Sequence, residues 1–284
     1  ASPVLLSTPM CSFMPKYHCW PLRVWCISGS RCFCAFLVEL GAPMIVASTI
    51  VPEAAPVYYA GGQTIDDGSL GNLVAGNSTF SGIGAISNGG PGDYHILSNL
   101  VGTNVNNTSA LPNGFGIYVG TFASNTVEIG DISPLGRNVI AGNASDGIAV
   151  LTGYAVKIVN NAIGVTSTNV SLGNGGNGIN VGNLIPAYNT TIGGTDTTSA
   201  NIIANNGKAG VKVNAGSILN PIRGNSIQNN AALGIDLSTG TFFPDGDGDT
   251  DNDCLDGDTG ANGFQNYPVL LSTATDPQGN TKVI

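Results

Sequence analysis

The chain has 284 residues, and charged residues make up only 10% of it, where soluble domains carry about 25%. This sparse charge excludes a long amphipathic helix or coiled coil, and 42% hydrophobic residues exclude a disordered chain. The net charge of −9 argues against a partner with a phosphate backbone, so we expect no nucleic-acid binding. The 41 Gly and the many Asn favour turns over helices, which predicts a turn-rich β protein.

Residues 1–56 are expected to form an atypical N-terminal extension or cap, rich in Cys and aromatic residues. Five of the six Cys lie here, at Cys11, Cys19, Cys26, Cys32 and Cys34. Their spacing matches no paired Cys-x-x-Cys zinc pattern, which leaves a metal or disulfide cap and a poorly ordered extension as alternatives. Glu39 and Pro43 interrupt the apolar run over residues 32–51, so we expect no membrane span.

The hexapeptide Pro-Val-Leu-Leu-Ser-Thr occurs twice, at residues 3–8 and at residues 268–273. A match of this length is not expected by chance. We therefore expect the chain to be part of a longer multi-repeat protein, with the start of a truncated following unit over residues 271–284.

A phrase of the form Gly-Ile-x-Val recurs along the middle of the chain. Its glycines are 34, 31, 31, 32 and 24 residues apart, at Gly82, Gly116, Gly147, Gly178, Gly210 and Gly234. A second phrase, Asn-x-x-Ala-x-Asn, recurs at about twice that period and begins at Asn72, Asn138 and Asn201. This periodicity indicates a solenoid in which each repeat packs on the next.

Each repeat is predicted to hold three short strands separated by Gly and Asn turns. Strand geometry places Ile148 and Val150 on one face and Ala149 on the other, and the other copies share this parity. Strands this short need the equivalent strand of the next repeat as a partner, and Asn side chains at a corner are expected to hydrogen-bond along the stack. The predicted fold is all-β, a parallel β-helix of about six repeats over residues 57–240.

The sequence resembles the right-handed parallel β-helix (pectin-lyase-like) proteins, in particular the Gly/Asn-rich repeats of large bacterial surface or secreted proteins. The resemblance covers about residues 57–268 and is carried best by residues 138–150, where Asn-x-Ile-x-Gly-Asn is followed by Gly-Ile-x-Val. It implies an extracellular or cell-surface location. The scaffold hosts lyases, hydrolases and epimerases as well as inert adhesin stalks, so the fold alone does not assign an activity.

The outward position of the Gly-Ile-x-Val strand reads Gly84, Tyr118, Ala149, Asn180, Lys212 and Asp236. Parallel strands stack about 4.8 Å apart, so Lys212 and Asp236 are expected to meet as an exposed ion pair worth under about 1 kcal/mol. A hydrolase needs a second carboxyl group within about 5–10 Å of the first, and no other acid occupies this row. His95 is expected in a strand over residues 94–97 rather than as a base.

Lyases of the fold that the sequence resembles use a basic residue beside a cation that neutralises charge. The resemblance then leaves Lys208, Lys212 and Arg223, together with Asp236, as the candidates for catalysis. A glycan contact without catalysis is the other reading of this face, with Tyr118 stacking on a sugar ring and Asn180 as a hydrogen-bonding neighbour. The partner in that case is a polysaccharide or a cell-surface glycan.

Seven of the eighteen acidic residues lie within residues 245–258. Ca²⁺ prefers six to eight oxygen ligands, and the spacing here is similar to the Asp-rich loops of EF-hand, dockerin and thrombospondin type 3 repeats. The expected ligands of a Ca²⁺ ion are Asp245, Asp247, Asp249, Asp251, Asp253 and Asp256. Thr250 and Asp256 depart from the Gly and Glu of such loops, which leaves a solvated acidic loop as the alternative. Residues 241–270 are thus expected to hold this loop and a closing segment.

We therefore expect a non-catalytic extracellular stalk or adhesin-like module of a large bacterial surface or secreted protein that contacts carbohydrate. The alternative is a polysaccharide-active enzyme, a lyase or a hydrolase, of the pectin-lyase-like fold. Outside residues 245–258 the chain has eleven acids against nine basic residues, so the body of the repeat is close to neutral.

Overall fold

The structure is a computed structural model that describes residues 25–27, 31–33, 44–47, 57–60, 64–65, 72–86, 92–121, 125–133, 135–182, 185–238, 260–264, 273–275 and 281–283. In these residues nearly every regular element is a short β-strand. The exceptions among them are two 3-10 helices, η1 (Thr197–Ser199) and η2 (Ala261–Phe264).

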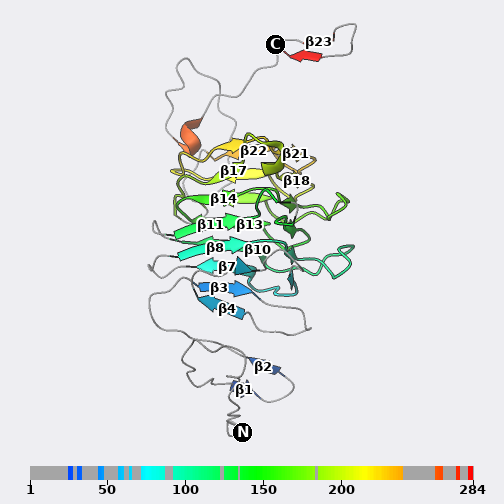
Figure 1. The fold of residues 1–284 in the computed structure, drawn as a ribbon, viewed down its shortest axis with the longest axis vertical. Helices are drawn as coiled ribbons and strands as arrows, with labels where there is room; N and C mark the ends of the chain where they lie inside the picture. The colour runs from blue at the N-terminus through cyan, green and yellow to red at the C-terminus, as the bar shows by residue number, and fades with distance from the viewer. Residues whose placement is uncertain are drawn as a thin grey trace.

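Three stacks of parallel strands make up the body of the protein (Figure 1). Sheet 1 contains β7 (Ser81–Ile86), β10 (Phe115–Gly120), β13 (Ile148–Thr152), β16 (Ile179–Val181), β19 (Val211–Val213) and β22 (Ile235–Leu237). Sheet 2 contains β5 (Thr64–Ile65), β8 (Gly92–Ile96), β11 (Asn125–Ile129), β14 (Val156–Ile158), β17 (Thr191–Gly193) and β20 (Ile222–Arg223). Sheet 3 contains β6 (Leu73–Val74), β9 (Leu100–Val101), β12 (Val139–Ile140), β15 (Ala162–Ile163), β18 (Ile202–Ala204) and β21 (Ser226–Gln228).

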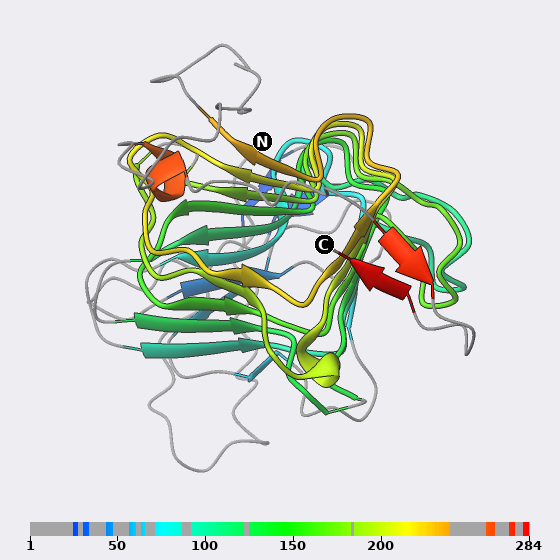
Figure 2. The same cartoon turned by 90° about the horizontal axis from the view of Figure 1, so that it is seen from above.

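The order of these strands along the chain makes the body a parallel β-helix. Each strand of sheet 2 is followed by one of sheet 3 and then one of sheet 1, and each pairs in parallel with the strand one turn away. Figure 2 shows the coil from above, with the sheets arranged around a common core. The predicted fold class is confirmed.

The number of turns is smaller than the repeat count predicts. Each sheet has six parallel strands, but the first and last lie at the ends of the coil. About four turns are complete, with neighbours on both sides in all three sheets. The prediction of six was wrong because it counted the two terminal repeats as full turns.

Antiparallel pairs occur outside this coil. At the N-terminal end of sheet 1, β3 (Met44–Ala47) pairs antiparallel with both β7 and β4 (Val57–Ala60). The other two pairs are β1 (Trp25–Ile27) with β2 (Arg31–Phe33) and β23 (Thr273–Thr275) with β24 (Thr281–Val283).

The core is a column of aliphatic side chains contributed by all three sheets. The parity predicted for the Gly-Ile-x-Val strands is confirmed, since their Ile and Val side chains point inward and are fully buried at Ile83, Ile117, Val119, Ile148, Val150, Ile179, Val181, Val211 and Val213. Ile235 occupies the same position in the last strand and is 43% exposed, because no further strand of the described coil covers it. The last turn is therefore the less protected end of the core.

Two ladders of asparagine side chains run along the coil, one at each edge of sheet 3. In every step the side-chain Nδ2 of one Asn donates to the Oδ1 of the Asn one turn later, at 2.8–3.0 Å. The ladder between sheets 2 and 3 contains Asn72, Asn99, Asn138, Asn161, Asn201 and Asn225. The ladder between sheets 3 and 1 contains Asn77, Asn113, Asn143, Asn174, Asn206 and Asn230. The predicted hydrogen bonding along a corner is confirmed, at two corners.

The outer face of sheet 3 is covered by the chain itself. Val139, Ala162 and Val165 form a second apolar cluster, with Leu172 packed against it from the segment that follows β15. This covering leaves the outer faces of sheets 1 and 2 as the places where functional side chains can gather.

The helix η2 supplies the corner between sheets 1 and 2 in the last turn. The backbone N–H of Asn262 donates to the carbonyl oxygen of Ser217. In earlier turns the backbone N–H of Tyr188 donates to the carbonyl oxygen of Gly153 in the same way. Asn262 also bonds Asn220 through its Oδ1 and Nδ2, at 3.0 and 2.8 Å, and Ala261 is fully buried in the core. Residues 260–264 therefore belong to the last turn of the coil, as Ser238 does.

Candidate functional site

The outer row of sheet 1 has the register that the sequence predicts. Gly84, Tyr118, Ala149, Asn180, Lys212 and Asp236 are successive partners on neighbouring strands. The two halves of this row differ in chemistry. Tyr118 in the N-terminal half has aromatic neighbours, whereas the C-terminal half consists of polar and charged residues.

The aromatic half is a cluster of Phe80, Phe115 and Tyr118. The ring centroids of Phe80 and Phe115 lie 5.9 and 6.0 Å from that of Tyr118, in tilted arrangements typical of aromatic pairs. Phe80 is 55% exposed, whereas Tyr118, which parity predicts to be exposed, is half-buried. Burial raises the pKa of the Tyr118 hydroxyl above its ordinary value. The sequence reasoning missed Phe80 and Phe115, since neither belongs to the outward row.

Asn180 is buried and its amide is already engaged within the protein. Its Nδ2 donates to Oδ2 of Asp146 at 2.9 Å, and its Oδ1 accepts from Nδ2 of Asn214 at 2.6 Å. Ala149 stands between it and Tyr118 in the row. Tyr118 and Asn180 are therefore two strands apart in the row. The side chains that contact Tyr118 are those of Phe80 and Phe115.

Lys212 and Asp236 meet as predicted, with Nζ 3.6 Å from Oδ2, but the prediction that they are exposed was wrong. Only 8% of Lys212 and 9% of Asp236 is accessible. Both side chains lose hydrating water on burial, so the stability contribution expected of an exposed ion pair does not apply to this pair.

The basic residues proposed for catalysis do not converge. Lys212 lies in the middle of β19, while Arg223 ends β20 in sheet 2 and Lys208 is exposed in the turn before β19. The sequence grouped these residues because they are close along the chain. In a coil, residues close in sequence lie on different sides, and residues one turn apart are neighbours.

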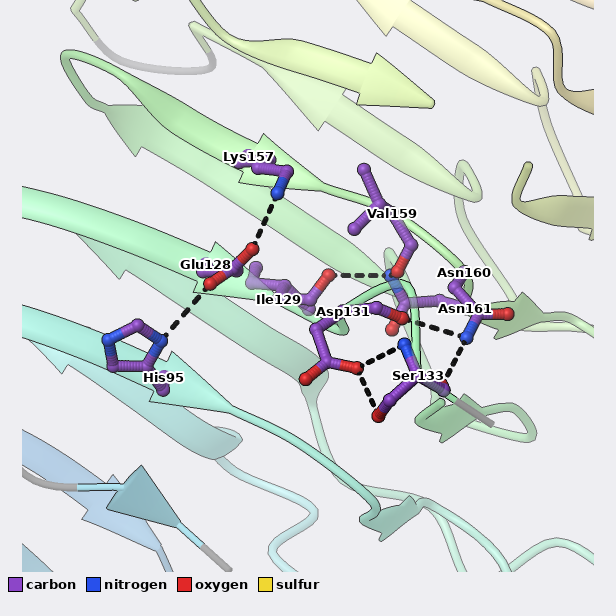
Figure 3. Close-up of polar contacts among 9 residues, drawn as sticks. All are labelled: His95, Glu128, Ile129, Asp131, Ser133, Lys157, Val159, Asn160 and Asn161. Atoms are coloured by element: carbon purple, nitrogen blue, oxygen red, sulfur yellow. Dashed lines mark hydrogen bonds and ion pairs between the residues drawn. The ribbon is translucent and has the colours of Figure 1, made fainter. Parts of the chain in front are cut away.

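A row of three ionisable side chains lies on the outer face of sheet 2 (Figure 3). His95, Glu128 and Lys157 are register partners on β8, β11 and β14. One carboxylate oxygen of Glu128 lies 3.2 Å from Nδ1 of His95, and the other accepts from Nζ of Lys157 at 2.7 Å. His95 lies in a strand, as predicted, but its charged neighbours were not foreseen.

The corner beyond β11 is fixed by hydrogen bonds on the same side of the coil (Figure 3). Oδ1 of Asp131 accepts from the backbone N–H of Ser133 at 2.8 Å, and Nδ2 of Asn160 donates to the carbonyl oxygen of Asp131 at 2.8 Å. The strand that carries Glu128 is thus anchored just past its end, which holds the three-residue row on a rigid support.

The six predicted Ca²⁺ ligands lie outside the described residues, as do residues 1–24 and the Cys of that segment. The residues on either side of the Asp-rich segment are described, and both belong to the last turn: Ser238 is bonded to Val213 and Asn262 to Ser217. Within the described ranges, no three His, Cys, Asp or Glu side chains gather in a way that suits a metal ion.

A search of the described residues finds no helix with the length and apolar character needed to span a bilayer. Comparisons of the chain with protein-family models, with curated proteins and with solved structures give no match. The fold is therefore established from the strand pairing, and membership of the pectin-lyase-like family stays a prediction.

Proposed function

We propose that the chain is a non-catalytic stalk or adhesin-like module of a large bacterial surface or secreted protein, located outside the cell. The observation that carries this proposal is the pair of asparagine ladders. The polar side chains of the coil are used to bond one turn to the next, so they support a continuous rod rather than an open site. The near-neutral composition of the repeat body supports the same function.

The cluster of Phe80, Phe115 and Tyr118 is the surface that we propose contacts carbohydrate. Aromatic faces stack on the apolar faces of sugar rings, and Phe80 offers the largest exposed face of the three. A polysaccharide or a cell-surface glycan is the partner that this surface suits.

We expect Phe80→Ala to weaken glycan binding about tenfold, which corresponds to about 1.4 kcal/mol of lost contact. The measurement is calorimetric titration of the full chain with hexasaccharides of neutral glucose and of galacturonate. Val105→Ala is the matched control, because Val105 is also an exposed apolar residue but lies in the loop after β9. Equal affinities for the two variants would contradict the proposal that the aromatic cluster binds the glycan. If the unmodified chain does not bind, the proposed carbohydrate contact is wrong.

The Asp-rich segment is proposed to bind Ca²⁺, because it supplies closely spaced carboxylates that repel one another without a cation. Ca²⁺ at about 100 times its Kd would add about 2.7 kcal/mol of stability, or about 5 °C in the unfolding midpoint. The measurement is differential scanning calorimetry with Ca²⁺ and after chelation. Asp249→Asn together with Asp251→Asn should remove the shift, while Asp131→Asn should retain it. An unchanged midpoint after chelation would contradict the proposal.

A polysaccharide lyase is the second candidate function, and the row of His95, Glu128 and Lys157 favours it. Glu128 holds the imidazole at Nδ1, which leaves Nε2 to take a proton, and Lys157 places a positive charge beside the row. The discriminating assay is absorbance of unsaturated uronate products from mixed polyuronides. If the unmodified chain forms product, and product is lost in His95→Ala but kept in Arg223→Ala, the lyase proposal replaces the stalk proposal. If the unmodified chain forms no product, the result supports the stalk proposal.

A further inference from the structure

Three asparagines of the ladder between sheets 3 and 1 are followed directly by glycine. These steps are Asn113-Gly114, Asn174-Gly175 and Asn206-Gly207. The close approach of neighbouring turns requires the glycines, because a Cβ at each of them would lie only 2.3–2.6 Å from a carbonyl oxygen of the turn before. The packing of this corner therefore places Asn-Gly steps inside the ladder.

An Asn-Gly step carries its own modification chemistry. The backbone nitrogen of the glycine can attack Cγ of the asparagine side chain, because glycine has no Cβ to hinder the approach. The new C–N bond forms and the bond from Cγ to Nδ2 breaks, so that ammonia leaves with the proton of the glycine nitrogen. Water then opens the cyclic imide at either carbonyl group, which leaves aspartate or isoaspartate in place of asparagine.

The folded coil holds both reacting groups of each step in hydrogen bonds. The glycine N–H of all three steps donates to the backbone carbonyl oxygen of the preceding ladder asparagine, at 2.8–2.9 Å. The three asparagine side chains are at most 1% exposed, and the ladder fixes their amides. Attack requires the glycine nitrogen to turn toward Cγ, so the reaction depends on local opening of the coil.

Asn206 is the least firmly held of the three asparagines. Nδ2 of Asn113 and of Asn174 each donates both to the next ladder oxygen and to a backbone carbonyl oxygen. Within the part of the chain that the structure describes, Nδ2 of Asn206 makes only the ladder bond, to Oδ1 of Asn230 at 2.9 Å. The backbone N–H of Asn206 donates to the same oxygen at 3.1 Å. One side chain of the last turn therefore supplies both contacts.

The turn that contains Asn230 lies at the exposed end of the coil. Ser226 and Gln228 of its strand β21 are exposed, and the inward Ile235 of β22 is 43% exposed. Among the described strands, none pairs with β21 on its outer side. A turn with fewer buried contacts opens more often than the turns inside the stack, so Asn206 loses its acceptor before the other two steps are disturbed.

We propose that Asn206 is a site of spontaneous deamidation that is controlled by opening of the last turn. Departure of Asn230 leaves fewer hydrogen bonds to hold the step to Gly207 closed. The modification makes the opening permanent, because aspartate at position 206 has no side-chain N–H to donate to Asn230. Isoaspartate adds a backbone atom and shifts the register against the neighbouring turn.

The test follows the full chain in mildly alkaline buffer by intact mass and peptide mapping, since each deamidation adds about 1 Da. In urea we expect modification at all three Asn-Gly steps and much slower modification at Asn143, a member of the same ladder that is followed by Ala144. In the folded chain we expect Asn113 and Asn174 to be protected and Asn206 to be modified slowly. A folded chain that modifies Asn206 as fast as the chain in urea would overturn the proposal.

Asn230→Ala removes both contacts from the last turn to Asn206. In the folded variant we expect deamidation at Asn206 to rise about tenfold or more, with Asn113 and Asn174 still protected. Asn230→Asp keeps the acceptor oxygen and should keep Asn206 protected, as should Gln228→Ala, which changes an exposed residue of the same turn. An unchanged rate at Asn206, or an equal rise at all three steps, would overturn control by the last turn.

The unmodified chain gives the same comparison in urea below its unfolding midpoint, so the test does not depend on folding of the variant. There Asn206 should be modified before Asn113. Equal rates at the two sites under these conditions would also overturn the proposal.

Discussion

Replacing Gly164 by Ala is expected to lower the free energy of unfolding by more than about 3 kcal/mol, from backbone strain and overpacking together. The residue has φ +78°, where an L side chain is strained, and a Cβ there would overlap the carbonyl oxygen of Ala204 and lie 2.6 Å from Oδ1 of Asn206. Asn206 belongs to the ladder between sheets 3 and 1, so it cannot move without disturbing its partners. Urea unfolding followed by circular dichroism measures the loss.

Gly76→Ala is the matched control for this substitution. Gly76 has a similar φ of +84°, but a Cβ there would meet no atom within 4 Å. Only the backbone strain then applies, and the expected loss is about 1 kcal/mol. If the two variants lost the same stability, the close approach of neighbouring turns at Gly164 would not contribute.

Replacing Asn143 by Ala is expected to destabilise the protein by about 3 kcal/mol, because three hydrogen bonds are lost in a buried position. Nδ2 of Asn143 donates to Oδ1 of Asn174 at 2.8 Å and to the carbonyl oxygen of Val101 at 3.3 Å, and its Oδ1 accepts from Nδ2 of Asn113 at 2.9 Å. The substitution leaves buried polar groups without partners on the turns above and below. The measurement is again the urea unfolding curve, with native-state hydrogen exchange to locate the loosened turns.

The control for the ladder is Asn106→Ala, which changes the same side chain in an exposed loop after β9. We expect a change within about 0.5 kcal/mol there. Protection of the Val101 and Asn174 turns should fall in Asn143→Ala and stay unchanged in Asn106→Ala. A loss at Asn143 no larger than at Asn106 would show that the ladder is incidental to stability.

The coil itself follows from short-range patterns in the sequence. The alternation in Gly147-Ile-Ala-Val150 sets the inward face, and the repeated Asn at both ends of residues 138–143 places the two ladders. These patterns suffice because each turn buries the inward aliphatic side chains of its three strands and forms the same asparagine hydrogen bonds at both edges of sheet 3. A single repeat thus contains most of the information that the fold needs.

The outer faces are less predictable because they depend on register across unequal repeats. His95, Glu128 and Lys157 are 33 and 29 residues apart, and no single period brings all three together. Only the pairing of β8, β11 and β14 shows that they share a row. A search for ionisable residues at the outward position of every strand, rather than of the Gly-Ile-x-Val strand alone, would have found them.

The strand pattern also does not predict how deeply side chains on the outer face are buried. Alternation assigns Lys212 and Tyr118 to the outside, but it does not say what else lies there. Tyr118 is half-buried and packs against Phe80 and Phe115, which flank the row, and Asn180 is enclosed by Asp146 and Asn214. Phe115 begins β10, whereas Phe80, Asp146 and Asn214 lie between strands, where the repeat is least regular.

The asparagine ladders have a polarity that follows the order in which the chain is synthesised. In every Asn–Asn step of the two ladders, Nδ2 donates to the Oδ1 of the turn that comes later in the chain, from Asn72 to Asn225 and from Asn77 to Asn230. A turn leaving the ribosome therefore carries donors whose acceptors have not yet been synthesised, and the arrival of the next turn satisfies them. The Asn–Asn hydrogen bonds of each turn are thus completed in the order of synthesis, and only the most recently made turn has ladder donors without their Asn acceptors.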